Sequence, residues 1–280
     1  MGASGRVCRL LLSHWRDAPT KDIAVKAQSR QAGFDLQWSP LDDGPPPLER
    51  FVQIHGKPKA IIALIGATPT TQGDMAQTTA LAVAVIKAAE RAGIARVVFA
   101  SSSAVYPLNA DLTEDVPPAP TSPYGLAKLE MEQAVASLQT IVDVCCLRIG
   151  NVAGADALLG QAERATKDTP IALDQFPDGN GPLRSYISPQ KLAACLEQIA
   201  HHNAPLPDVL NCASSSPVEM AALLDAADLD WVWTPAAASR MASQKITLDC
   251  TLLGHIVGDT LLDADPSDMI ADLRKLGVLD

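Results

Sequence analysis

A tyrosine and a lysine four residues apart carry the clearest chemical signal in this sequence. They are Tyr124 and Lys128, in the segment Ser122-Pro123-Tyr124-Gly125-Leu126-Ala127-Lys128. At helical spacing the two side chains share a face, and an ammonium group near a phenol favours the phenolate. We therefore expect the pKa of Tyr124 to fall from about 10 towards neutrality, so that the pair can exchange protons with a hydroxyl or carbonyl.

A predicted helix and a predicted strand position these side chains. Ser122 is suited to cap the helix and Pro123 to be its first residue, so the helix begins just before Tyr124. Upstream, the β-branched and aromatic run at 96–100 indicates a buried strand, whose carboxyl end carries the hydroxyls of Ser101, Ser102 and Ser103. The carboxyl ends of parallel strands are where open α/β sheets build their sites.

The order of these segments resembles the extended short-chain dehydrogenase/reductase superfamily, and within it the NAD-dependent epimerase/dehydratase family. The likeness covers most of the chain. Besides the serine, tyrosine and lysine, it rests on Thr113-Glu114-Asp115, Pro120, the run from Leu147 to Gly154, Arg184-Ser185-Tyr186-Ile187 and Leu210-Asn211. The resemblance implies that Ser102 hydrogen-bonds the reacting oxygen, that Tyr124 exchanges its proton, and that Lys128 binds the nicotinamide ribose.

Alternating strand and helix patterns predict an α/β fold with a mostly parallel sheet covered by helices on both faces. The resemblance makes this a doubly wound, Rossmann-like sheet with a small C-terminal substrate lobe. It places the nucleotide-binding domain at 1–152 plus 187–213 and the substrate lobe at 153–186 plus 214–280. The predicted helices are 6–16, 72–92 and 123–138, and the predicted strands are 23–27, 36–38, 60–65, 96–101 and 142–148.

The helix at 72–92 is apolar on nearly every side, so both of its faces must be covered. One face can pack on the sheet. For the other, the resemblance implies a homodimer that pairs this helix with the helix at 123–138. The alternative is a cover made by loops of the same chain.

The N-terminal segment is similar to the family's glycine-rich nucleotide loop. Gly2 and Gly5 stand at the first two glycine positions of a Gly-x-x-Gly-x-x-Gly motif, with Cys8 in place of the third glycine, and the resemblance implies cofactor contacts at Gly2, Ser4, Gly5 and Arg6. Glycines there permit a tight turn and a close approach of the backbone to a pyrophosphate on the helix N-terminus. The family's first strand would precede Gly2, and we expect it to be missing from the chain given.

The second predicted strand bears on the choice between NAD and NADP. NAD-binding relatives carry an acid at its end, whereas this chain has Arg30, whose guanidinium suits the 2′-phosphate of NADP. The alternative is a solvated loop arginine, and the choice between the two cofactors stays open with a lean towards NADP. The resemblance adds Gly66, Ala67 and Ile149 to the cofactor contacts.

The resemblance also implies substrate contacts at Ser103, Asn151 and Arg184, where relatives hold a sugar or its phosphates. A structural ion pair is the alternative role for Arg184. Relatives that dehydrate their substrate carry two acids where this chain has Ser103 and Ala104. Sugar dehydration is therefore disfavoured.

Composition narrows the class of protein. A net charge of −10 and a pI near 4.9 argue against nucleic-acid binding and against anionic membrane surfaces. We read no apolar run of membrane-spanning length and no signal peptide, and expect a cytoplasmic protein with a small-molecule substrate. The six cysteines lack paired metal-binding spacing and the five histidines show none, so we expect reduced core thiols and no metal.

Together these observations predict an NAD(P)-dependent epimerase or reductase of a sugar or nucleotide sugar. The alternative is a catalytically degenerate protein of the same fold that senses nucleotides or serves as a scaffold, motivated by the expected loss of the first strand. A fold that binds no nucleotide is a third interpretation.

Overall fold

The structure is a computed structural model that describes residues 1–19, 23–66, 75, 77–258, 261 and 263–279. Two compact units divide the chain. The first comprises Met1–Pro107, Pro117–Arg148 and Leu196–Leu210, and the second comprises Leu108–Val116, Ile149–Cys195 and Asn211–Asp280. These bounds differ from the predicted domains, most visibly at 108–116 and 187–195. The assignment of one part to nucleotide and another to substrate stays a prediction.

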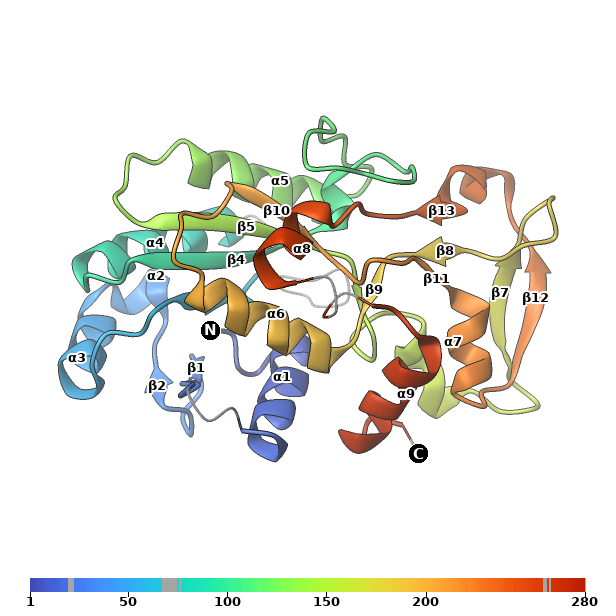
Figure 1. Cartoon of the computed structure of the whole chain (residues 1–280), viewed down its shortest axis with the longest axis horizontal. Helices are drawn as coiled ribbons and strands as arrows, with labels where there is room; N and C mark the ends of the chain where they lie inside the picture. The colour runs from blue at the N-terminus through green and yellow to red at the C-terminus, as the bar shows by residue number, and fades with distance from the viewer. Residues whose placement is uncertain (20–22, 67–74, 76, 259–260, 262, 280) are drawn as a thin grey trace. The chain divides into compact units, whose positions relative to one another are not determined.

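A four-stranded sheet in the order β10-β5-β4-β3 forms the first unit's centre (Figure 1). Its strands are Val209–Cys212, Asp143–Ile149, Arg96–Ser102 and Ile61–Ala63 respectively. β3 and β4 run parallel, with Ile61 opposite Val97. Val97 and Phe99 are fully buried, as expected for a strand covered on both faces. The predicted α/β class with mostly parallel pairing is confirmed.

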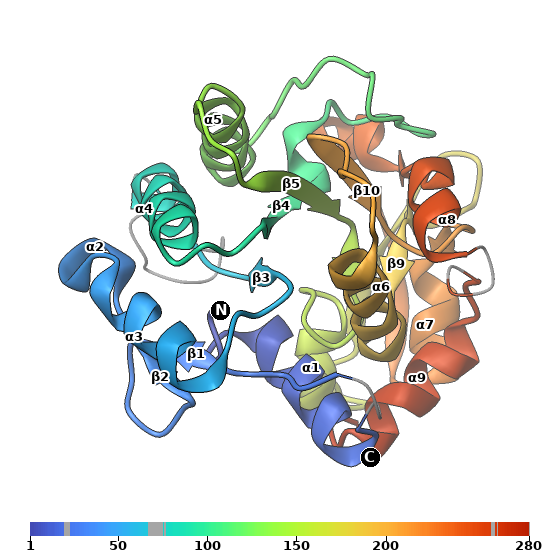
Figure 2. The same ribbon diagram turned by 60° about the vertical axis from the view of Figure 1, so that its left-hand side comes forward.

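Helices cover both faces of this sheet, as Figure 2 shows. α4 (Gln77–Arg91) and α5 (Pro123–Ala136) lie together on one face, and α6 (Pro189–His201) lies on the other. α2 (Pro40–Asp43) and α3 (Pro46–His55) pack on α4, so neighbours from the same chain cover part of its outer surface. Of the predicted helix at 72–92, positions 72–74 and 76 lie outside the described residues.

The predicted strand at 23–27 is wrong. The ladder forms only at β1 (Gln28–Ser29), which pairs in parallel with β2 (Leu36–Gln37), and Ala27 adds one hydrogen bond, accepted by its carbonyl from Leu36 N–H at 3.1 Å. This pair stands apart from the four-stranded sheet. A β-branched segment becomes a strand only where a neighbouring backbone accepts its hydrogen bonds, and residues 23–27 lack one on the side facing β3.

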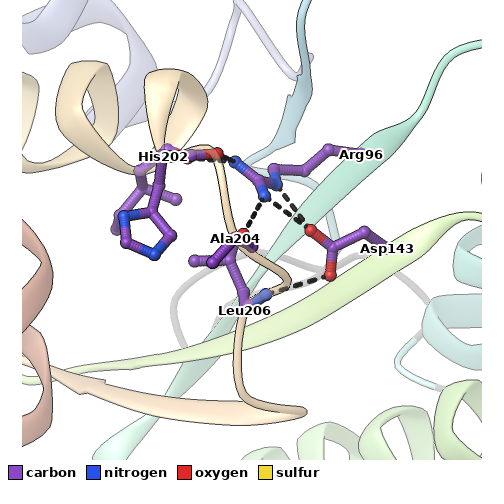
Figure 3. Close-up of polar contacts among 6 residues, drawn as sticks. Arg96, Asp143, His202, Ala204 and Leu206 are labelled. Carbon is purple, nitrogen blue, oxygen red and sulfur yellow. Dashed lines mark hydrogen bonds and ion pairs between the residues drawn. The ribbon is translucent and has the colours of Figure 1, made fainter.

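A buried arginine joins the amino-terminal ends of β4 and β5 to the connection after α6 (Figure 3). Arg96, at the start of β4, donates from Nε to Asp143 Oδ2 at 2.7 Å. Its Nη1 and Nη2 groups donate to the carbonyls of His202 and Ala204 at 2.6 and 2.7 Å, just after α6. Asp143 also accepts from the backbone N–H of Leu206. One side chain thus ties together β4, β5 and the connection that follows α6.

The second unit is built from short ladders and three further helices. β6 (Asn151–Val152) pairs with β9 (Tyr186–Ile187), and β7 (Ile171–Gln175) pairs with β12 (Trp231–Pro235), both in parallel. A third ladder has the order β11-β8-β13, formed by Val218–Glu219, Leu183–Arg184 and Lys245–Ile246. The helices are α7 (Met220–Ala226), α8 (Thr251–Val257) and α9 (Pro266–Lys275).

All six cysteines are buried free thiols, as the sequence predicts. Within the described ranges, no helix combines the length and the apolar character needed to cross a bilayer.

Candidate active site

β4 and α5 bring Ser102 and Tyr124 together. Ser102 is the last residue of β4, and its Oγ accepts the backbone N–H of Ala104 at 3.2 Å. α5 begins at Pro123, and Ser122 caps it by accepting the N–H of Gly125 at 3.1 Å. The predictions that Ser122 caps the helix and that Pro123 is its first residue are confirmed, and Tyr124 lies in the helix's first turn.

The first turn of α5 lies against the loop after β4 because Gly125 has no side chain. A Cβ at Gly125 would come 2.1 Å from the carbonyl oxygen of Ala104, closer than any side chain tolerates. This contact brings the neighbouring Tyr124 within hydrogen-bonding distance of Ser102, and the two hydroxyls are bonded. The serine and the phenol, 22 positions apart in sequence, therefore share one site.

Lys128 lies in the same part of the first unit but is bonded elsewhere. Its side chain is 4% exposed, and Nζ donates to the carbonyl of Ala100 at 2.7 Å and to that of Ile65 at 3.4 Å. Nζ stands 5.9 Å from the centre of the Tyr124 ring. The ammonium group is thus on the tyrosine's face of the helix, as predicted, and main-chain oxygens hold it.

The expected fall in the pKa of Tyr124 is not found. Burial raises the pKa of the phenol above its usual 10.0, and the hydrogen bond from Ser102 only opposes that rise. Burial also lowers the pKa of Lys128 to about 8, although the Cys146 thiol and the Glu132 carboxylate act in the opposite direction. Helical spacing alone did not reveal the burial of the phenol, which is the largest cause of the rise in the pKa of Tyr124.

A buried polar network supports this site, and sequence reasoning missed it. Glu132, one helical turn after Lys128, accepts two hydrogen bonds at Oε2 from Arg148, the shorter at 2.7 Å. Its Oε1 accepts from Ser101 Oγ at 2.5 Å, and Arg148 also donates to the hydroxyl of Tyr106 at 2.8 Å. Glu132 and Arg148 are each about one-twentieth exposed. The sequence contained one signal for this network: Glu132 follows Lys128 by four residues, so the two side chains share a face of the helix.

This network fixes the helix that carries Tyr124 to the strand that carries Ser102. Ser101 is the neighbour of Ser102 on β4, Arg148 lies on β5, and Glu132 belongs to α5. Burial opposes the charge of Arg148, but the hydrogen bonds and the negative charge of Glu132 outweigh it and raise the pKa of the guanidinium. The guanidinium therefore keeps its charge against the Glu132 side chain, and the bonded pair sets the register between helix and sheet.

The glycine turn at the N-terminus fits a dinucleotide diphosphate. Gly2 has φ of 83°, and a Cβ there would come 2.4 Å from the carbonyl oxygen of Leu64. Gly5 N–H donates to the Gly2 carbonyl at 2.9 Å, and α1 (Arg6–Asp17) begins directly afterwards. Ser4, Gly5 and Arg6 are exposed. The turn thus presents the positive end of a helix dipole without side chains blocking the approach.

The other residues predicted to contact the cofactor differ in their exposure and in the element that carries them. Arg30 is exposed and directly follows β1. Gly66, with φ of 113°, follows the strand region of β3, and a Cβ there would meet Thr78 and the Lys128 ammonium at 3.3–3.5 Å. Ala67 lies outside the described residues. Ile149 is buried at the end of β5, at the start of the second unit.

Two of the predicted substrate residues lie in the second unit. Asn151 hydrogen-bonds the hydroxyl of Tyr186, which in turn donates to Asp156 Oδ2 at 2.9 Å. Arg184 donates from Nη1 to the carbonyls of Leu183 and Gln244 at 2.8 and 2.9 Å. Main-chain oxygens thus orient the Arg184 guanidinium. Ser103, the third residue, is half-buried in the short helix Ser103–Val105 of the first unit.

Proteins of known identity resemble this chain in parts of their sequence. A UDP-glucose 4-epimerase of Azospirillum brasilense is 40% identical over 102 residues, which are 34% of this chain and 27% of that protein. A UDP-glucose 4-epimerase of Bacillus subtilis (strain 168) is 40% identical over 74 residues, 25% of this chain and 22% of that protein. The matched part therefore spans about a quarter of the length of these relatives.

Solved structures resemble the whole chain. A UDP-glucose-4-epimerase from Stenotrophomonas maltophila, with bound NAD and formylated UDP-arabinopyranose, superposes with a TM-score of 0.75 at 17% identity, covering 98% of this chain and 96% of its own. A short-chain dehydrogenase/reductase superfamily protein from Agrobacterium tumefaciens with bound NAD gives 0.74 at 19% identity, covering 99% and 95%. The fold is accordingly Rossmann-like.

The family assignment comes from the sequence itself. Residues 1–189, which include the glycine turn, Ser102, Tyr124, Lys128 and Arg184, match the family described as NAD dependent epimerase/dehydratase. The chain belongs to the NAD dependent epimerase/dehydratase family.

Proposed function

We propose that this chain is an NAD-dependent epimerase of a UDP-sugar, with Tyr124 as the group that exchanges a proton with the reacting hydroxyl. The observation that carries the proposal is the hydrogen-bonded Ser102–Tyr124 pair beside the buried Lys128. Membership in the family supports it, as do the UDP-glucose 4-epimerases that resemble part of the chain.

The protein's own groups would divide the work. Tyr124 takes the proton of the substrate hydroxyl and later returns it, while Ser102 hydrogen-bonds the same oxygen. Lys128, whose pKa is about 8, is mostly protonated at neutral pH and keeps a positive charge beside the phenol. The nicotinamide, when bound, supplies reversible hydride acceptance. The glycine turn and the N-terminus of α1 would hold the diphosphate of the cofactor.

Tyr124→Phe tests this assignment directly. Losing a positioned general acid and base lowers turnover by about 10²- to 10⁴-fold, so kcat should fall that far while NAD binding changes little. Glu130→Ala, an exposed position on the same helix, is the matched control. Equal turnover of Tyr124→Phe and the control would refute the proposed role.

The pH dependence of turnover adds a second test. Burial raises the pKa of Tyr124, so the phenol holds its proton at neutral pH, and accepting one requires that proton to leave first. We expect kcat of the full chain to increase as the pH rises through the alkaline range. A rate that falls over that range would contradict Tyr124 as the base.

An epimerase regenerates its cofactor within each turnover, whereas a reductase consumes the reduced form. Net absorbance loss of reduced nicotinamide, in proportion to the product formed, would identify a reductase instead. Ser103 and Ala104 stand where dehydrating relatives carry acids, which supports epimerisation over dehydration.

NAD is the proposed cofactor, and Arg30 is the residue that would admit NADP. Two neighbours in structure carry bound NAD, whereas the exposed Arg30 guanidinium is suited to a 2′-phosphate. Fluorescence titrations of the chain with NAD and with NADP give a dissociation constant for each, and the lower one identifies the preferred cofactor. Arg30→Ala should weaken NADP binding and leave NAD binding unchanged if Arg30 meets the phosphate.

We also propose Asn151 and Arg184 as substrate ligands in the second unit. Two main-chain carbonyls orient the Arg184 guanidinium, and its remaining N–H groups suit a diphosphate oxygen. Arg184→Lys should raise KM for a UDP-sugar more than it lowers kcat. An unchanged KM would exclude Arg184 from the substrate site.

A homodimer through α4 and α5, within the predicted ranges 72–92 and 123–138, is a further proposal. Leu126 of α5 is 49% exposed, and Leu81 and Val83 of α4 are only half-buried in the single chain. Light scattering should give twice the mass of the chain, 29.5 kDa. A monomer at high protein concentration would rule out this pairing.

A catalytically silent nucleotide binder is the second candidate. The observation that favours it is the raised pKa of Tyr124, together with the bonds that Lys128 Nζ makes to the carbonyls of Ile65 and Ala100. Saturable NAD binding without turnover of any UDP-sugar would identify this alternative.

A further inference from the structure

A carboxyl group and a phenol are bonded to each other inside the second unit, outside the proposed proton-exchange site. Tyr186 is fully buried in this unit's apolar core, and its hydroxyl donates to Asp156 Oδ2 at 2.9 Å. The same oxygen accepts the backbone N–H of Leu158 at 3.1 Å. The other oxygen, Oδ1, is buried and bonds none of the residues that the structure describes. Burying such an acid costs stability, so its place beside Tyr186 requires a further explanation.

Asn151 lies directly opposite Tyr186 in the β6–β9 ladder. The two residues are register partners, and the backbone N–H of Asn151 donates to the carbonyl of Ser185 at 2.8 Å. Partners in a ladder direct their side chains to the same face of the sheet. The side-chain amide of Asn151 accordingly reaches the Tyr186 hydroxyl and forms a hydrogen bond with it. Asp156, Tyr186 and Asn151 thus form one hydrogen-bonded acid–phenol–amide series.

The single proton of the Tyr186 hydroxyl fixes the direction of each bond in the acid–phenol–amide series. That proton is donated to Asp156 Oδ2, so the phenol oxygen acts towards Asn151 as an acceptor. An amide donates through Nδ2 and never through Oδ1, so Nδ2 must face Tyr186. Oδ1 branches from the same carbon and faces another direction. Asn151 therefore has one defined orientation, although the two ends of its amide are nearly equal in shape.

The protonation state of Asp156 does not alter this orientation. Burial raises the pKa of Asp156 above its usual 3.8, and the bonds from Tyr186 and Leu158 oppose the rise. Because Oδ2 already accepts two hydrogen bonds, a proton on the carboxyl group would reside on Oδ1. Oδ2 remains an acceptor with or without that proton. Tyr186 therefore donates to Asp156 in both states of the carboxyl group.

We propose that Asp156 is a positioning residue that acts through Tyr186 to turn the Asn151 carbonyl towards the substrate, where it accepts a hydrogen bond from a hydroxyl of the sugar. This inference rests on the proposed function, in which Asn151 and Arg184 are substrate ligands. Arg184, the proposed diphosphate ligand, precedes Tyr186 by two residues, and the sugar is bonded directly to the diphosphate. A carbonyl attracts a hydroxyl and repels a phosphate oxygen, whereas a reversed amide would do the opposite.

Substitutions at Asp156 test the direction of the bonds. Asp156→Leu removes the acceptor, so the Tyr186 hydroxyl can donate to Asn151 Oδ1 and the amide can reverse. Asp156→Asn is the matched control, because it keeps a carbonyl oxygen for Tyr186 and Leu158. Calorimetry of the full chain with NAD present gives Kd for UDP-glucose and for UDP, which lacks the sugar.

The ratio of the Kd for UDP-glucose to the Kd for UDP isolates the contact with the sugar. It should increase about three- to tenfold in Asp156→Leu, which is the effect of one hydrogen bond, and less than about twofold in Asp156→Asn. An equal loss of affinity for both ligands would place Asn151 at the uridine diphosphate and overturn the proposal. An unchanged ratio in Asp156→Leu would overturn it as well.

Tyr186→Phe tests whether Asp156 acts through the phenol. This variant keeps the buried ring and removes the hydroxyl, so the ratio should increase about as much as in Asp156→Leu. Adding Asp156→Leu to Tyr186→Phe should change the ratio no further. Additive effects of the two substitutions would contradict an action through Tyr186. Because Tyr186→Phe alone must also raise the ratio, it tests the proposal even if Asp156→Leu does not fold.

The side-chain amide of Asn151 reports the orientation without a ligand. In a ¹⁵N-labelled full chain, its NH₂ signals are identified by their loss in Asn151→Asp. These protons should exchange with water at least about fivefold faster in Asp156→Leu than in the unchanged chain or in Asp156→Asn. Equal exchange rates would overturn the proposed orientation. Failure of the unchanged chain to bind UDP-glucose would instead refute the proposed function, and the exchange rates would still decide the orientation of Asn151.

Discussion

The two sides of the first unit are held together by different means. On one side, β4, β5 and α5 are joined by the buried pairs Arg148–Glu132 and Arg96–Asp143, each at 2.7 Å. On the other side, residues 1–3 hydrogen-bond both β3 and β1, beside an apolar cleft of about 400 Å³. The proposed proton-exchange residues lie on the braced side, and the glycine turn lies on the open side.

The difference shows what each kind of contact can specify. A buried ion pair has one geometry that satisfies all its hydrogen bonds, so it fixes the register of α5 against β4 within a narrow range. The apolar packing that lines the cleft has no such directional requirement. We therefore expect the side with the buried ion pairs (the braced side: β4, β5 and α5) to lose more stability when a polar side chain is removed. We expect the side with the apolar cleft (the open side: β3 and the β1–β2 pair) to respond mainly to changes in packing.

The largest effect is expected from Glu132→Ala on the braced side. It leaves the Arg148 guanidinium buried without its carboxylate, and breaking such a pair costs about 3–5 kcal/mol of unfolding free energy. Urea denaturation followed by circular dichroism measures the loss. Glu130→Ala, an exposed glutamate on the same helix, should change stability by less than about 0.5 kcal/mol. Similar losses in the two variants would contradict the bracing role.

Arg96→Ala should have the next largest effect. It removes the partner of Asp143 and of the carbonyls at the end of α6, for an expected loss of about 2–3 kcal/mol. Arg91→Ala is the matched control, because the Arg91–Glu49 pair has the same 2.7 Å separation but an exposed arginine. Exposed pairs contribute about 0–1 kcal/mol. The same denaturation assay measures both variants. An equal loss of unfolding free energy in Arg91→Ala and Arg96→Ala would contradict the prediction.

On the open side, Gly2→Ala should cost about 1–3 kcal/mol. The new Cβ would come 2.4 Å from the Leu64 carbonyl, and the φ of 83° disfavours any side chain. Gly33→Ala is the control, since Gly33 has a similar φ of 95° but nothing within 4 Å of the added carbon. We expect a smaller loss there, and weaker NAD binding for Gly2→Ala alone. Equal losses would show that backbone strain, rather than the Leu64 contact, dominates at Gly2.

The smallest effect is the pH dependence contributed by the Met1 amine. Its pKa is lowered by burial in the folded chain and is about 8.0 when unfolded, so the unfolded state binds more protons between those two values. Stability from this group is present above pH 8 and is lost as the pH falls through that window. Acetylating the α-amino group should remove this slope, as thermal melts of both forms across pH 6–9 would reveal. Parallel curves for the two forms would contradict a buried amine.

Much of the arrangement around Ser102 follows from local patterns. The apolar run at 96–101, the Ser122–Pro123 start of the helix and the Tyr124–Lys128 spacing predicted β4 and α5 almost to the residue. These signals are local because caps, propensity and periodicity act within a few residues. The strand at 23–27 failed for the opposite reason, since its pairing depends on a backbone neighbour far away in sequence.

The sequence by itself determined the family, the alternation of strands and helices, and which residue types are available for proton exchange. Only the tertiary structure decided the direction in which the pKa of Tyr124 shifts. Burial of the phenol raises that pKa, and the spacing to Lys128 does not predict the burial. The tertiary structure also places Glu132 between Ser101 and Arg148. It forms the cleft that residues of β3 and residues 23–28 line. Solvation and backbone pairing depend on what surrounds a residue in space, and local sequence does not contain that information.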